Sequence, residues 1–170
     1  IKSQVLADFV AEWTDAELPK EYGAYSNWIM HFDGSKMLAG LGAGVVLSSP
    51  TGDTVQYVCQ ILYTDSNNTA EYEALLHGLR MAVSMGIQCL EVRGDSNLAI
   101  SQINGDFDAK DPKMVAYRHA VLKVSTRFEG LEFHHVAREN NQAADILACI
   151  GATCDAVPPS YFWIGFSSHP

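Results

Sequence analysis

Four acidic residues of this chain stand at positions where carboxylates could serve a reaction: Asp33, Glu71, Asp95 and Asp145. Asp33 and Asp95 each end an apolar stretch that predicts a buried strand, where an unpaired carboxylate loses its hydration. Four carboxylates gathered without cations would repel one another and raise one another's pKa values. Hard divalent metals resolve this conflict, and an all-oxygen ligand set selects magnesium or manganese over zinc.

Two such ions about 3.5–4 Å apart would clamp a phosphodiester for hydrolysis, because one activates water and the other stabilises the departing oxygen. The sequence alone also allows purely structural roles for two of these acids. Asp33, Gly34 and Ser35 together are also a common turn sequence, and the spacing of Asn68 and Glu71 fits a capping box at a helix start. No Ser/His/Asp nucleophile set competes with metal-assisted hydrolysis.

The elements that must position these acids follow the order β-β-β-α-β-α-α-β-α, which predicts an α/β fold with a five-stranded mixed sheet and helices packed on it. The predicted strands are 27–33, 45–47, 54–63, 87–93 and 131–136, and the predicted helices are 67–85, 97–103, 112–128 and 140–152. The glycine-rich loop 39–44 leads into a strand and not a helix, which excludes a phosphate-binding loop. If the first and fourth strands are neighbours, Asp33 and Asp95 lie close together. A helix packed beside them then brings Glu71 into the same pocket.

The 170 residues predict one domain with attached chain on both sides. Residues 1–24 are predicted as a connector that contains a short amphipathic helix, and residues 25–155 hold the domain. Residues 156–170 form a C-terminal tail or linker, whose apolar residues 161–166 are expected to pack on something outside this chain. No apolar run reaches the roughly 18 residues that crossing a membrane requires.

The net charge of −9 argues at first sight against a nucleic-acid partner. Residues 24–150 carry 14 acids and nine bases, a balance of −5, which two divalent cations would bring to about −1. The four cysteines form neither a CxxC pair nor a Cys/His zinc spacing. We therefore expect reduced thiols in an intracellular protein.

Four short motifs contain or lead to the four acids: Phe32-Asp-Gly-Ser35, Asn67-Asn-Thr-Ala-Glu-Tyr72, Gly94-Asp-Ser96 with Asn97, and His135-Val-Ala-Arg-Glu-Asn140 leading to Ala144-Asp145. Their order and spacing resemble type 1 ribonuclease H over about residues 25–155. The variant is similar to the ribonuclease H domain of plant gypsy-class long-terminal-repeat retrotransposon polyproteins. Residues 7–13 are similar to the segment that joins reverse transcriptase to that domain.

This resemblance implies a ribonuclease H-like fold and an endonuclease that cuts the RNA strand of RNA–DNA hybrids, leaving 5′-phosphate and 3′-hydroxyl ends. It implies two Mg²⁺ ions, for which Mn²⁺ can substitute, held by the same four carboxylates, and no small-molecule cofactor. The expected partners are the hybrid and an adjacent reverse transcriptase domain, with no membrane. The expected location is intracellular, in a cytoplasmic retroelement particle, with the nucleus as the alternative.

The resemblance also implies a set of substrate contacts, some of which would read the 2′-hydroxyls of RNA along the minor groove. Ser66 would contact a phosphate of the DNA strand, and the asparagines have turn and cap roles as an alternative. The set is Gly34, Ser35, Ser66, Asn67, Asn68, Ser96, Asn97 and Arg138.

Two departures from the family pattern predict weaker hybrid binding and slower turnover. The loop before the last aspartate has no histidine, so Arg138 is the partial substitute, and His134 and His135 are predicted as sheet residues. The basic helix-loop of many members is also missing. The remaining candidates for DNA contact are Lys110, Lys113, Arg118 and Lys123.

The alternative function is a non-catalytic domain of the same fold, serving as a spacer or hybrid-binding module within a reverse transcriptase. Decay of activity should erase the acids first, because a metal-free carboxylate cluster has only costs. All four acids are present, which favours the nuclease. An exonuclease or a DDE-type integrase fits poorly, because those folds place a carboxylate pair in the first strand or a final glutamate on the last helix.

Overall fold

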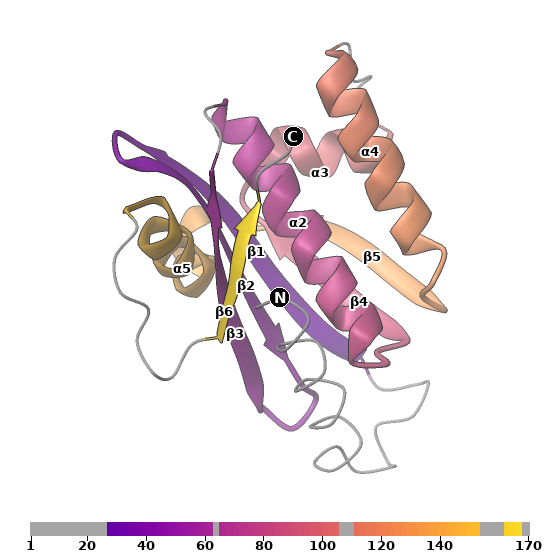
Figure 1. The fold of residues 1–170 in the computed structure, drawn as a ribbon. Coiled ribbons are helices and arrows are strands. Elements are labelled where there is room, and N and C mark those ends of the chain that lie inside the picture. Colours follow the sequence, from indigo (N-terminus) through magenta and orange to yellow (C-terminus); the bar gives the residue numbers. More distant parts are fainter. Residues whose placement is uncertain (1–26, 63–64, 106–110, 154–161, 168–170) are drawn as a thin grey trace.

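Six strands form one mixed sheet in the order β5-β4-β1-β2-β3-β6 in the computed structural model, which describes residues 27–62, 65–105, 111–153 and 162–167 (Figure 1). The strands are β1 (Asn27–Met37), β2 (Gly40–Ser48), β3 (Thr54–Ile61), β4 (Cys89–Gly94), β5 (Gly130–His135) and β6 (Phe162–Ser167). The β1-β2-β3 meander is antiparallel, whereas β4 pairs parallel to both β1 and β5. The predicted five strands are confirmed, and β1 and β4 are neighbours as expected. The predicted end of the first strand at Asp33 is corrected, because β1 stays paired with β2 as far as Met37.

β6 is an addition to the predicted sheet. The apolar tail was expected to pack outside this chain, but residues 162–167 pair parallel to β3 with a shift in register. The physical reason is that the edge of β3 presents unpaired N–H and C=O groups, which accept a further strand. The predicted helix of the connector lies outside the described residues.

Helices cover both faces of the sheet, with α2, α3 and α4 on one face and α5 on the other (Figure 1). They are α2 (Asn67–Ser84), α3 (Asn97–Asn104), α4 (Pro112–Ser125) and α5 (Gln142–Thr153), with a 3₁₀ turn η1 (Arg138–Asn140) before α5. α4 starts as predicted, with Asp111 as the cap and Pro112 in the first turn. None of these described helices is both long and apolar enough to cross a membrane.

Two glycines of β2 determine how closely α5 approaches the sheet. A Cβ at Gly42 or Gly44 would overlap the backbone of α5, at Ala148 and Ala144 respectively. The stretch predicted as a glycine-rich loop is therefore mostly strand, and its glycines serve helix packing. On the other face, Phe32 and Val45 are buried in the main core beneath α2. The first turn of α5 is thus held directly against β2, at Gly44, which is the register partner of Asp33 on β1.

Candidate active site

Asp33 and Asp95 are brought together by the parallel pairing of β1 and β4. Phe32 is the register partner of Gly94, so each aspartate directly follows one member of this pair. A Cβ at Gly94 would meet the ring of Phe32 at 2.5 Å. The glycine therefore keeps the two strands in this register while Phe32 fills the core beside them.

Glu71 reaches the same place because α2 contacts β1 backbone to backbone. A Cβ at Gly34 would overlap the backbone of Ala70 and Glu71. Gly34 was predicted as a substrate contact, and here its lack of a side chain also permits the close approach of the helix. Glu71 lies in the first turns of α2, is 3% exposed and accepts a hydrogen bond from the backbone of Gly34.

The structure brings the four predicted carboxylates together. Carboxylate oxygens of Asp33, Glu71 and Asp95 all lie within 4.8 Å of one another. Asp145, in the first turn of α5, shares a hydrogen bond with Asp33. All four acids line one polar cavity of about 470 Å³. Its other lining residues are Gly34, Ser35, Lys36, Asn67, His135, Val136, Ala137 and Arg138.

Crowding and burial make this site electrostatically unfavourable. The pKa of Asp33 is raised to about 7, and burial is the largest cause. A hydrogen bond with Glu71 acts in the lowering direction, whereas the hydrogen bond with Asp145 and the charges of Asp95 and Asp145 also raise this pKa. Burial, followed by the charge of Asp33, raises the pKa of Glu71 to about 10. Within the described part of the chain, none of these acids forms an ion pair with lysine or arginine.

The residues fit a hard divalent cation. Oε2 of Glu71 is buried and has no hydrogen-bond partner among the described residues. A buried carboxylate oxygen without a partner is costly, and a bound cation would satisfy it. The donor set consists of carboxylate oxygens alone, which suits magnesium or manganese.

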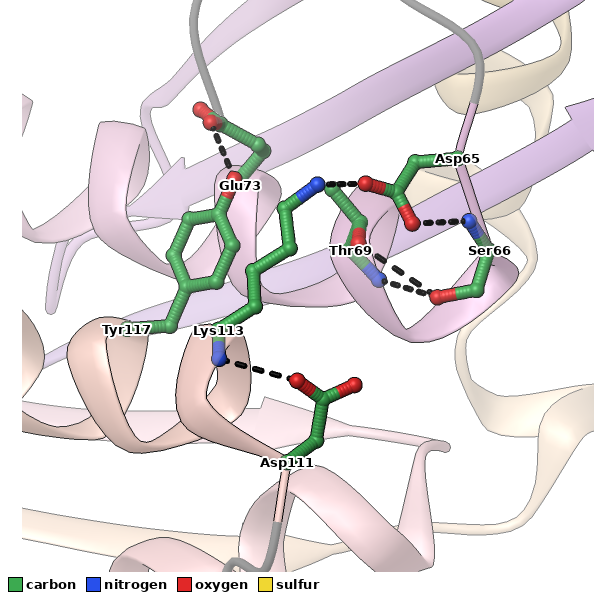
Figure 2. Close-up of polar contacts among 7 residues, drawn as sticks. All are labelled: Asp65, Ser66, Thr69, Glu73, Asp111, Lys113 and Tyr117. Atoms are coloured by element: carbon green, nitrogen blue, oxygen red, sulfur yellow. Dashed lines mark hydrogen bonds and ion pairs between the residues drawn. The ribbon is translucent and has the colours of Figure 1, made fainter.

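The first turn of α2 corrects one structural interpretation. Asn68 and Glu71 were considered as a capping box, but the cap is Ser66, whose Oγ accepts from the backbone N–H of Thr69 at 3.3 Å (Figure 2). The helix begins two residues earlier than a cap at Asn68 would require. Glu71 consequently lies two residues beyond the position from which it could cap the helix, and its carboxylate faces Asp33 instead.

The predicted substrate contacts divide into two groups. Ser35, Asn67 and Arg138 line the cavity together with Gly34. Ser66 and Ser96 serve as helix caps, and Asn97 is the exposed first residue of α3, where its Oδ1 accepts from Ser101. Asn68 is half-buried. These four lie outside the cavity lining, at the starts of two helices that begin beside it.

Two of the candidate DNA-contacting bases of α4, Lys113 and Arg118, have partners within the protein. Lys113 forms an ion pair with Asp65, which ties the start of α4 to the start of α2 (Figure 2). Nε of Arg118 donates to the main-chain oxygen of Gln102 at 2.7 Å. Lys123 is exposed, and Lys110 lies outside the described residues. Lys113 and Arg118 would have to exchange these contacts in order to meet a phosphate.

Sequence reasoning missed three residues at the site. Lys36 and His135 line the cavity, although His135 was predicted only as a sheet residue. It is indeed the last residue of β5, but β5 runs parallel to β4 and both strands end at the cavity edge. Asn141, buried beside the site, was also not singled out. The available signal was an asparagine four residues before Asp145, at the start of a helix.

Comparisons with known proteins agree with this fold. Residues 31–150 match the sequence model of the family described as reverse transcriptase-like. The chain is 37% identical over 105 residues to the ribonuclease HI of Halobacterium salinarum, an alignment that covers 62% of this chain and 53% of that protein. The chain belongs to the reverse transcriptase-like family and is a homologue of ribonuclease HI.

Solved structures show the same relationship. The crystal structure of RNase H1 from the halophilic archaeon Halobacterium salinarum NRC-1 matches with a TM-score of 0.67 and 31% identity, covering 74% of this chain and 96% of that chain. The crystal structure of LC11-RNase H1 in complex with an RNA/DNA hybrid matches with a TM-score of 0.63 and 27% identity, covering 72% and 94% respectively. The ribonuclease H-like fold is therefore shown. The chain spans about half the length of the archaeal ribonuclease HI it matches.

Proposed function

We propose that this chain is an endonuclease that hydrolyses the RNA strand of RNA–DNA hybrids with divalent metal ions. One observation carries the proposal: Asp33, Glu71 and Asp95 converge within 4.8 Å in a polar cavity that is large enough to admit a phosphodiester. The relatives named ribonuclease H, one of them in complex with an RNA/DNA hybrid, support the substrate class.

Asp33, Glu71, Asp95 and Asp145 would hold two Mg²⁺ ions, for which Mn²⁺ could substitute. When bound, the ions supply activation of water and neutralisation of the charge that develops on the phosphate and the leaving oxygen. The four carboxylates provide the negative charge that holds such ions, and their fixed positions on β1, α2, β4 and α5 set where the reacting phosphate must lie.

Other cavity residues bind and orient the substrate in this proposal. Lys36 and Arg138 present positive charge beside the acids, which favours a phosphate backbone. Asn67 and Ser35 offer hydrogen-bonding groups to the sugar edge of the RNA strand, where the 2′-hydroxyl distinguishes RNA from DNA. Ser66, Asn68, Ser96 and Asn97, at the neighbouring helix starts, extend this contact along the hybrid.

The proposal extends to the context of the domain. The resemblance of the sequence to retrotransposon polyproteins is the ground for proposing a neighbouring reverse transcriptase domain and, with it, an intracellular retroelement particle. The relatives reported above are named as ribonucleases H alone. The connector residues 7–13 that carry part of this resemblance lie outside the described residues. Cleavage of a hybrid by the chain expressed with and without its upstream neighbour would measure that dependence.

The decisive experiment is cleavage of a uniform RNA–DNA hybrid by the purified chain in Mg²⁺ or Mn²⁺, with and without chelator. We expect metal-dependent cutting of the RNA strand only, with double-stranded DNA left intact. Binding of the hybrid with no cutting under either metal would favour the alternative of a non-catalytic spacer or hybrid-binding module.

A further inference from the structure

Each of the other three site acids is held near Asp33 by a different structural feature. The pairing of β1 with β4 places Asp95, and the close contact of Gly34 with α2 places Glu71. Both features are backbone packing. Asp145 lies on α5, whose separation from the sheet is set by the glycines of β2. Packing against glycines sets how closely the helix approaches the sheet, and a directional hydrogen bond can in addition fix the position of its first turn along the sheet.

Asn141 connects the start of α5 to the strand that carries Asp33. It is the residue directly before α5 and is 1% exposed. Its Nδ2 donates to the main-chain oxygen of Phe32 at 2.9 Å. Its own main-chain oxygen accepts from the N–H of Asp145 at 3.1 Å. A single residue therefore bonds through its side chain to the residue before Asp33 and through its backbone to Asp145.

We propose that Asn141 is a positioning residue that holds Asp145 in reach of Asp33, so that the two carboxylates bind the same metal site. This inference rests on the proposed function, because it gives Asn141 a role only through the acids that would hold the metal.

The chemistry of the side chain agrees with this role. The contact to Phe32 requires a donor, which the amide supplies and an ionised aspartate would not. Oδ1 of Asn141 is buried without a hydrogen-bond partner among the described residues. An apolar side chain would fill the same space without leaving a buried oxygen unpaired. The single bond from Nδ2 is thus the feature that distinguishes asparagine from an apolar residue at this position.

The test compares Asn141→Ala with Gln102→Ala in the full chain. Gln102 is also buried and accepts a hydrogen bond from Tyr72, but it does not line the cavity. Mn²⁺ affinity is measured by calorimetric titration without substrate, and kcat and KM are measured on the hybrid. We expect Asn141→Ala to weaken Mn²⁺ binding and to lower kcat by about 10- to 100-fold, as loss of an outer-shell partner does. The KM of Asn141→Ala for the hybrid should stay close to the parent value. Gln102→Ala should keep the parent's Mn²⁺ affinity, kcat and KM.

Asn141→Asp provides the same comparison should the alanine variant fail to fold, because it keeps the volume and the helix-start preference but loses the donor when ionised. Parental Mn²⁺ affinity in folded Asn141 variants, with thermal destabilisation equal to that of Gln102→Ala, would show a merely structural role and overturn the inference.

A parent chain that binds Mn²⁺ but does not cut the hybrid would contradict the proposed function instead, while the affinity comparison would still decide the role of Asn141.

Discussion

Within the residues that the structure describes, two groups of side chains are compact enough to hold a metal ion, and they differ in burial and in their charge partners. Asp33, Glu71 and Asp95 form the first, and Glu91, Glu132 and His134 on β4 and β5 form the second. In both groups the possible ligand atoms lie within 4.8 Å of one another. Asp33 and Glu71 are only 4% and 3% exposed, whereas the side chains of Glu132 and His134 are 72% and 48% exposed.

The second group already has positive or hydrogen-bonding partners. Nη2 of Arg93 lies 2.6 Å from Oε2 of Glu91, and Nε2 of His134 lies 3.0 Å from Oε2 of Glu132. Water also screens these exposed charges. In the first group Asp33 and Glu71 are buried and Asp95 is half-buried, and these acids form no ion pair with lysine or arginine in the described ranges. Compactness alone therefore does not distinguish the two groups. Burial of carboxylates without a cationic side chain is the feature that favours the first group as the proposed metal site.

The largest effect that would separate the two groups is on catalysis. Asp95→Asn removes a charge from the buried group while keeping its shape, and we expect it to lower hybrid cleavage by about 10³-fold or more. The measurement is cleavage of a labelled hybrid in Mg²⁺, with folding checked by circular dichroism. Residual cutting near the parent rate would mean a contaminating nuclease or a misassigned site.

Metal binding should stabilise the protein through the buried group only. At a Mg²⁺ or Mn²⁺ concentration about 100 times the dissociation constant, binding adds about 2.7 kcal/mol to the free energy of unfolding. For a chain of this size, that gain corresponds to a rise of several degrees in Tm. Thermal melts with and without chelator should show this rise in the parent and in Glu132→Gln, but not in Asp95→Asn. A rise that Glu132→Gln abolishes would move the metal to the exposed group.

The metal-free protein should lose stability as the pH rises. The pKa of Asp33 is raised in the folded state from 3.8 to about 7, so its stabilising contribution is fully present below 3.8 and is lost as the pH passes through 7. Glu71, raised from 4.5 to about 10, continues the loss at higher pH. Denaturant melts in chelator should show the free energy of unfolding falling as the pH rises. In Asp33→Asn this fall should be smaller between pH 3.8 and about 7. A pH-independent free energy of unfolding in the parent would contradict the buried acid cluster.

The smallest effect is expected at the exposed group. Glu132→Gln removes an exposed partner of His134, and we expect the free energy of unfolding to change by no more than about 0.5–1 kcal/mol. Hybrid cleavage should be unchanged. A large loss of stability in urea melts would show that the exposed group is a structural network and would weaken the contrast between the two regions.

Local features of the sequence predicted much of the fold. Asp111-Pro112 predicts a helix start, because a capping aspartate and a first-turn proline depend on a few adjacent residues. The strand end predicted at Asp33 was wrong, because the antiparallel pairing of β1 with β2 continues to Met37. Gly86, with a φ of +76°, follows the end of α2 as expected. The order of elements and the set of four acids were likewise available from the sequence, and the resemblance to ribonuclease H added the expectation that they converge.

The tertiary structure alone decided contacts between residues far apart in the chain. The pairing of β6 with β3, the place of His135 at the cavity and the bond from Asn141 to Phe32 each depend on which strand lies beside which. Local propensity cannot distinguish among such partners, because it is set within a few residues.

The sequence by itself determined which acids were available and on which elements they lie. Only the folded arrangement decided that Asp33 and Glu71 are buried without a cationic side chain while Glu91 faces Arg93. The reason is that hydration and screening are properties of the surroundings in space, which the chemistry of a carboxylate and its neighbours in sequence do not specify.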